Sequence, residues 1–257
     1  MLDHPDDTRF TPPVRELGQV LRTSVVLWLV GLPGLLALAW QVGSRIQGST
    51  LPMWALPLLG GVQSCLLLAA AAFFGAWVAP RVGLGVPLLQ ALLTGRGVVL
   101  ALRHLWLPSI GAGVLGAAWM VSLAQFTPFE LMPGDPLQAL PLWAKLLYGG
   151  LSEEILARWG LMGLLLFGLW RVMQTRGGMP KPWLVWLAIV LSALVCSLAN
   201  LPPASVLLGS LTPQLVVYVV VGQTVLGLLT GFIYWRHGLE AAMLAHVLAL
   251  ALSHGLA

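Results

Sequence analysis

Long apolar runs are the feature that most constrains how this chain folds. Most of its 257 residues fall into seven such runs, and a helix needs about 20 apolar residues to cross a bilayer. Only 9% of the residues are charged and 58% are hydrophobic, whereas a soluble domain carries about 25% charged residues. This composition excludes a soluble globular protein and a disordered one. The sequence predicts an all-α, polytopic transmembrane helical bundle of about seven spans, within a range of six to eight. The predicted spans are 23–43, 51–79, 104–126, 142–172, 183–199, 212–235 and 239–256.

Two of these runs are longer than one crossing requires, and each contains a pair of glycines. We expect the second run to break at Gly60 and Gly61, and the fourth at Gly149 and Gly150. Between the second and third runs, residues 82–94 are interrupted by glycine and proline, which predicts a short interfacial helix.

Basic residues are distributed unevenly among the connecting segments. They are concentrated before the first span, after the second, after the fourth and after the sixth, which predicts a cytoplasmic N-terminus and an external C-terminus. We divide the chain into a polar cytoplasmic segment (1–22), N-terminal transmembrane helices (23–141) and a core (142–257) that holds the intramembrane charges. We expect an integral membrane protein of a bacterial inner or plasma membrane. No basic run is long enough to indicate nucleic-acid binding.

Ionisable residues inside the spans point to function, because each costs roughly 2.5–3.5 kcal/mol at the bilayer centre. Glu153, Glu154 and Arg158 lie in the fourth span, and His246 and His254 lie in the seventh. Glu154 and Arg158 have the i,i+4 spacing of a helical ion pair. Glu153 is rotated about 100° from Glu154 and has no basic residue within helical reach, so it is a candidate general base. The alternative is a structural ion pair beside a second, snorkelling glutamate.

Three segments resemble the motifs of one family. The run EEILAR, from Glu153 to Arg158, resembles the EExxxR signature of the CPBP intramembrane proteases, which include the type II CAAX prenyl endopeptidases and bacteriocin-processing enzymes. The run CSLANLP, which contains Cys196 and Asn200, lies where that family has FxxxH. The run GFIYWRHGLEAAMLAH, which ends at His246, resembles the third motif, a histidine preceded by a Tyr-x-Arg-x-Gly turn. The resemblance covers about residues 142–255.

The resemblance implies an all-helical fold with a water-filled cavity inside the membrane. It implies an intramembrane endopeptidase in which Glu153 activates the water that hydrolyses a peptide bond. Glu154 and Arg158 would support that residue, and His246 would stabilise the oxyanion. The implied partners are a membrane-embedded peptide or protein substrate and the lipid bilayer, and no cofactor is expected.

The chain departs from the family pattern at three positions. Asn200 replaces the histidine of the second motif and Cys196 replaces its phenylalanine, while Leu250 stands where an Asn or Asp is common. Asn200 can donate a hydrogen bond but cannot take up a proton near neutral pH. Leu250 removes one oxyanion donor, and His254, eight residues after His246, is a possible auxiliary group.

Other functions remain open from the sequence. The chain could be a catalytically inactive relative that binds hydrophobic peptide segments, or less favourably a proton-coupled transporter. A zinc site made by Glu153, His246 and His254 is less favoured, since the chain has no HExxH motif. The predicted topology puts Glu153 and Asn200 in the outer half of the membrane, so substrates would be approached from the external side.

Overall fold

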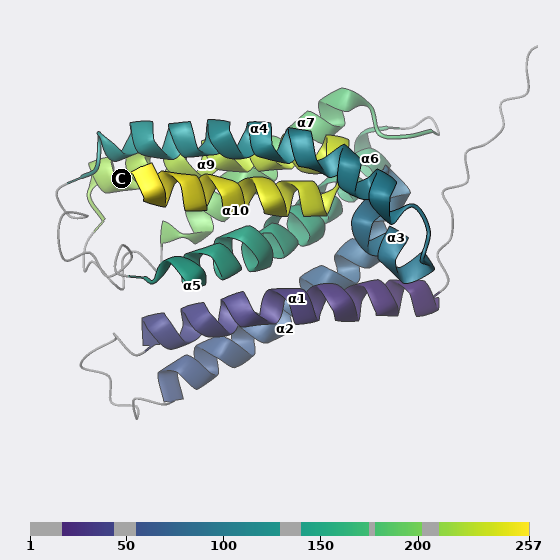
Figure 1. Cartoon of the computed structure of the whole chain (residues 1–257), viewed down its shortest axis with the longest axis horizontal. Coiled ribbons are helices and arrows are strands. Elements are labelled where there is room, and N and C mark those ends of the chain that lie inside the picture. The colour runs from purple at the N-terminus through teal and green to yellow at the C-terminus, as the bar shows by residue number, and fades with distance from the viewer. Residues whose placement is uncertain (1–16, 44–54, 129–139, 175–177, 202–210, 257) are drawn as a thin grey trace, which may run out of the picture.

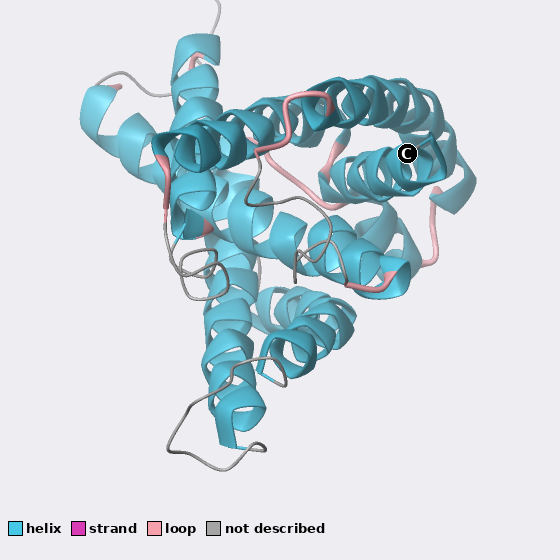
Figure 2. Cartoon of the chain, turned by 90° about the vertical axis from the view of Figure 1, so that its left-hand side faces the viewer, coloured by secondary structure: helices cyan, strands magenta, loops and turns pink. Residues whose placement is uncertain are grey.

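The computed structural model describes residues 17–43, 55–128, 140–174, 178–201 and 211–256. In these residues the regular structure is entirely helical, with no strand, as Figure 2 shows. The predicted all-α class is therefore confirmed. The elements are α1 (Leu17–Gly43), α2 (Ala55–Val78), the 3₁₀ turn η1 (Ala79–Val82), α3 (Pro87–Thr94), α4 (Val98–Ala124), α5 (Leu142–Leu147), the π-helices η3 (Tyr148–Glu153) and η4 (Ile155–Met162), α6 (Gly163–Met173), α7 (Pro182–Ala199), α9 (Pro213–His237) and α10 (Leu239–Leu256).

Six stretches of the described chain are helical, long and apolar enough to cross a membrane. They are Leu17–Gln41, Leu58–Val82, Val98–Ala124, Leu142–Met173, Pro182–Ala199 and Pro213–His237. The shorter apolar helix Leu239–Gly255 brings the bundle to the seven predicted spans. Large apolar side chains point outward along these helices, among them Leu66, Leu107 and Val172, whereas Glu154 and Arg158 are buried inside. Apolar side chains on the outside and charged side chains on the inside are the arrangement of an integral membrane protein, the reverse of that in a soluble one.

The two predicted glycine breaks were wrong, for different reasons. α2 runs without interruption through Gly60 and Gly61, since a glycine costs a helix only about 1 kcal/mol while unpaired backbone groups in lipid cost more. At Gly149 and Gly150 the chain stays helical but changes from α to π geometry. The short helix predicted near residues 82–94 is confirmed as α3, which begins at Pro87 and follows η1.

One continuous helical rod, made of α5, η3, η4 and α6, lies at the centre of the bundle. Figure 1 shows it between the α1–α2 pair and the group formed by α4, α9 and α10. Hydrogen bonds fix it to the α1–α2 pair: Ser152 Oγ donates to the Gly31 carbonyl at 2.6 Å, and Trp159 Nε1 donates to the Ala72 carbonyl at 3.1 Å. The rod therefore carries its polar residues into the packed interior.

Basic side chains gather at one end of the bundle. The start of α1, α3, the start of α4, the end of α6 and the turn between α9 and α10 all lie at the right of Figure 1. The C-terminal end of α10 lies at the opposite end. The described basic residues of the α3 end, which we call the basic end, are Arg22, Arg81, Arg96, Arg103, Arg171, Lys181 and Arg236.

Candidate active site

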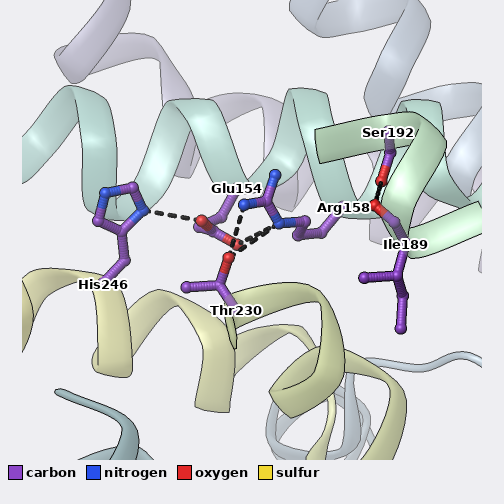
Figure 3. Close-up of polar contacts among 6 residues, drawn as sticks. All are labelled: Glu154, Arg158, Ile189, Ser192, Thr230 and His246. Carbon is purple, nitrogen blue, oxygen red and sulfur yellow. Dashed lines mark hydrogen bonds and ion pairs between the residues drawn. The ribbon is translucent and has the colours of Figure 1, made fainter. Parts of the chain in front are cut away.

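Four polar side chains from three helices meet inside the bundle (Figure 3). Glu154 and Arg158 come from the central rod, Thr230 from α9 and His246 from α10, and each is at most 4% exposed. Such groups are costly to bury in lipid unless they satisfy one another. We call these four residues the polar cluster.

Glu154 is bound through both carboxylate oxygens. His246 Nδ1 lies 2.8 Å from Oε1, and Arg158 Nε lies 3.4 Å from Oε2. The predicted i,i+4 ion pair is thus confirmed, and His246 completes it from another helix. The guanidinium also donates from Nε and Nη2 to Thr230 Oγ1, at 3.0 and 2.6 Å. The cluster therefore holds Glu154 and Arg158 in a single arrangement.

Thr230 belongs to the polar cluster and was not predicted from the sequence. An uncharged threonine in an apolar helix gives little signal by itself. It lies, however, between Gly227 and Gly231, whose GxxxG spacing indicates a close helix approach. A Cβ on Gly227 would lie 2.9 Å from the Ala193 Cβ and 3.4 Å from Arg158 Nη2. The missing side chain therefore makes room both for α7 and for the guanidinium.

Glu153 has a different environment from its neighbour. It is only partly buried, and it makes no hydrogen bond or ion pair with another described residue. It nevertheless interacts electrostatically with Glu154, Arg158 and His246. A carboxylate without a hydrogen bond to a described residue therefore stands next to one that is paired with a cation and an imidazole.

The π geometry of the rod determines what lies next to Glu153. A π-turn closes between residues five apart, so Tyr148 stands one π-turn before Glu153. Tyr148 and Cys196 of α7 both interact electrostatically with Glu153. The second motif, which contains Cys196, therefore lies near Glu153. Tyr148 was not among the site residues predicted from the sequence. Insertions of π-helix occur often at functional sites, but the sequence carries no simple code for them.

His246 fits over a glycine of the rod. A Cβ on Gly149 would lie 3.3 Å from His246 Nε2 and 3.0 Å from Leu250 Cδ1. Either contact is tighter than an ordinary van der Waals approach, so the bare glycine backbone is what admits the imidazole. Leu250, where the family commonly has Asn or Asp, stands beside His246 as an apolar wall.

The remaining predicted residues lie farther from the cluster. Asn200 caps the end of α7 and its Nδ2 donates to the Cys196 carbonyl at 3.1 Å, which uses one of its two amide N–H groups. His254 is exposed in the last turn of α10, about 12 Å along the helix from His246. No contact joins His254 to the polar cluster in the described residues. Within the same part of the chain, no group of three or more His, Cys, Asp or Glu is placed to hold a metal.

Comparison with protein families gives one match. Residues 135–252 match the family described as type II CAAX prenyl endopeptidase Rce1-like. The matched range contains the polar cluster, Glu153 and Asn200, and it confirms the family indicated by the three motifs. Searches of curated proteins and of solved structures gave no match.

Proposed function

Because residues 135–252 form a domain of the Rce1-like family of type II CAAX prenyl endopeptidases, we propose that this chain is a glutamate-dependent intramembrane endopeptidase. Its substrate is a membrane-associated peptide or protein, and the water that attacks the scissile bond is activated by Glu153. The family match supports intramembrane endopeptidase activity in general. The roles of individual residues follow from the site geometry.

The contrast between two consecutive carboxylates carries the proposal. Glu154 is fully buried and paired with His246 and Arg158, so its carboxylate is shut off from solvent. Glu153 is partly exposed and is not bound by any described residue. A general base must reach the water whose proton it takes, and of these two carboxylates Glu153 is the more exposed.

The reaction can be written with these groups. Glu153 takes a proton from water as the water oxygen bonds to the peptide carbonyl carbon, which gives a tetrahedral oxyanion. The carbon–nitrogen bond then breaks, and the proton held by Glu153 passes to the leaving amine. The products are a carboxylic acid, which keeps the second proton of the water, and an amine, and the glutamate returns to its starting state. The proposed reaction uses no cofactor.

His246 is placed to stabilise the oxyanion. Its Nδ1 faces the Glu154 carboxylate and is therefore the protonated nitrogen, which leaves Nε2 on the other side of the ring. In a neutral ring Nε2 accepts hydrogen bonds, and in the imidazolium it donates them. The oxyanion role that we assign to His246 therefore requires a proton on Nε2 as well as on Nδ1, so that Nε2–H is the donor.

We further propose that the basic end of the bundle faces the cytoplasm, as the positive-inside rule requires. α1 begins at this end, and α5 begins at the opposite, external end. Glu153 lies eleven residues after the start of α5, about 16 Å along the rod and near the middle of a 30 Å hydrocarbon core. Substrates would then be approached from the external side. A reporter fused between residues 128 and 140 that is found in the cytoplasm would contradict this orientation.

The proposal is tested by Glu153→Gln, which keeps the side-chain volume and removes the base. We expect membrane-protein termini produced by wild-type cells to be lost in the variant, because an amide cannot take the proton from water. The measurement is a quantitative comparison of protein termini in membranes from the two strains. Glu240→Gln is the matched control, since it makes the same chemical change outside the site.

The outcome also separates the alternative functions. If the variant accumulates in the membrane and no terminus changes, the chain is an inactive relative that binds hydrophobic segments. Proton-coupled flux through liposomes that depends on Glu153 would instead indicate a transporter. If the family mechanism operates with a weakened second motif, Asn200→His should raise the cleavage rate.

A further inference from the structure

A pocket at the basic end of the bundle lies outside the proposed active site. Its volume is about 470 Å³, and it forms where the Tyr-x-Arg-x-Gly turn between α9 and α10 meets α3 and the first turns of α4. Three basic side chains line it: His104, Arg236 and His237. Its described lining contains no Asp or Glu, and most other lining residues are small or apolar. The pocket therefore combines an apolar wall with positive charge.

The start of α4 adds to this positive character. Gly97 precedes α4 in the left-handed conformation, with φ +73°, and no side chain caps the helix. The first N–H groups of this 27-residue helix therefore lack helical partners, and the positive end of its dipole lies here. Gly97 and Leu100 line both this pocket and an adjoining one of about 530 Å³, which Arg103 also lines.

Two buried oxygens near the pocket, the Tyr234 hydroxyl and Glu240 Oε2, have no hydrogen-bond partner among the described residues. Tyr234, the first residue of the Tyr-x-Arg-x-Gly turn, lines the pocket and is 1% exposed. Leaving its hydroxyl unpaired costs roughly 1–3 kcal/mol. Glu240 does not line the pocket, and its Oε1 accepts a hydrogen bond from the Leu89 N–H at 2.8 Å. Its Oε2 would lie 3.3 Å from a Cβ on Gly238, which does line the pocket.

The surface next to the pocket suits an acyl chain. Leu100 lines the pocket and is 62% exposed, and Leu107, two turns farther along α4, is 80% exposed. Val99 and Trp106 are also exposed on this helix. The pocket is therefore a polar site that continues into an apolar surface, which is the profile of a phospholipid.

We propose that this pocket binds the phosphate headgroup of an anionic phospholipid. Arg236 and the two histidines would surround the phosphate oxygens, the start of α4 would contribute N–H groups, and the acyl chains would lie along the outer face of α4. A volume of about 470 Å³ lies in the range of small-molecule pockets. This inference does not depend on the activity of Glu153.

Lipid binding to the purified, delipidated full-length chain tests the proposal. Phosphatidylglycerol or phosphatidylcholine would be added, and the bound lipid measured by native mass spectrometry. We expect phosphatidylglycerol to bind more tightly. Arg236→Gln should weaken it about fivefold, the value for one basic residue at an anionic membrane surface, and His104→Gln should also weaken it. Both residues are exposed, so neither change disturbs the packed interior.

Arg171→Gln is the matched control, because it removes an exposed charge at the same end of the bundle without altering the pocket. Its affinity for phosphatidylglycerol should equal that of the wild type. Unchanged binding in both pocket variants, or equal binding of phosphatidylcholine, would overturn the proposal. If inorganic phosphate displaces phosphatidylglycerol at equal concentration, the pocket is a site for free phosphate and the lipid assignment is wrong.

Discussion

Two glutamates are held in the interior of this bundle in different ways. Glu154, at the centre of the rod, contacts the charged or ionisable groups of Arg158 and His246. Glu240, at the basic end, accepts the backbone N–H of Leu89 in the first turn of α3. The first carboxylate is paired with side chains, from its own helical rod and from α10, and the second with the backbone at a helix terminus.

We therefore interpret Glu240 as a structural carboxylate, and the surroundings of Glu154 as part of the proposed active site. The free N–H groups at the start of a helix can stabilise a carboxylate without any side-chain partner, and such a contact implies no chemistry. The polar cluster instead places a cation and an imidazole around Glu154 and leaves its neighbour Glu153 free of described partners. The same substitution at the two glutamates should therefore have effects of very different size.

The largest effect is expected for Glu154→Gln. The change leaves the Arg158 guanidinium buried without its counter-ion, and breaking a buried pair in this way costs about 3–5 kcal/mol. We expect a large fall in the unfolding temperature, together with loss of cleavage. The measurement is thermal unfolding in detergent, with Glu240→Gln as the matched change. Equal destabilisation by the two variants would remove the distinction between the two sites.

The next largest effect is expected for Gly149→Val. A side chain here meets His246 Nε2 and Leu250 Cδ1, so the imidazole must move away from its position over the rod. We expect cleavage to fall about 100-fold, equal to about 2.7 kcal/mol of transition-state stabilisation. The cleavage rate should be measured at saturating substrate.

Two further variants identify the cause of that loss. Gly168→Val is the control, because no atom lies within 4 Å of a Cβ at that position. Adding Leu250→Ala to Gly149→Val removes the contact with the leucine and leaves the contact with His246. If the double variant recovers full activity, crowding of Leu250 rather than displacement of His246 causes the loss.

Much of the fold could be predicted because lipid imposes strict rules on sequence. Apolar length and low charge indicate the spans, and the i,i+4 spacing of Glu154 and Arg158 correctly predicts their ion pair. The motif that ends at His246 indicates a residue of the site. These signals are local or compositional, so they can be read without knowledge of the packing.

What could not be predicted depends on contacts between helices. The π geometry of the rod, which brings Tyr148 one π-turn from Glu153, arises in the folded bundle and has no simple sequence signature. The glycines at 149 and 150 suggested a break, whereas they make room for His246 and Val247 of α10. The role of Thr230 becomes visible only when α9 is placed against Arg158.

A smaller effect is expected for Thr230→Val, which keeps the shape of the side chain and removes its hydroxyl. Arg158 then loses the acceptor of two hydrogen bonds, and a hydrogen bond to a charged group is worth about 2 kcal/mol. Equilibrium unfolding in denaturant measures the change. Thr230→Ser restores the hydroxyl and should recover most of the stability. If Thr230→Val leaves the free energy of unfolding unchanged, the two hydrogen bonds from Arg158 do not stabilise the protein.

The smallest effect is expected for Glu240→Gln. The amide oxygen can still accept the Leu89 N–H, so the change removes only the attraction between a negative charge and the start of α3, about 0.3–1 kcal/mol. The new amide N–H groups also lie near the Tyr234 hydroxyl, with which Glu240 interacts, and a hydrogen bond there would offset part of this cost. Glu240→Ala removes the acceptor as well and should cost about 1 kcal/mol more.

Unfolding of both variants under the conditions used for Glu154→Gln gives the comparison. A loss of several kcal/mol with glutamine would mean that the charge, rather than the acceptor, holds α3 against α10, and that the two buried glutamates are more alike than their contacts indicate.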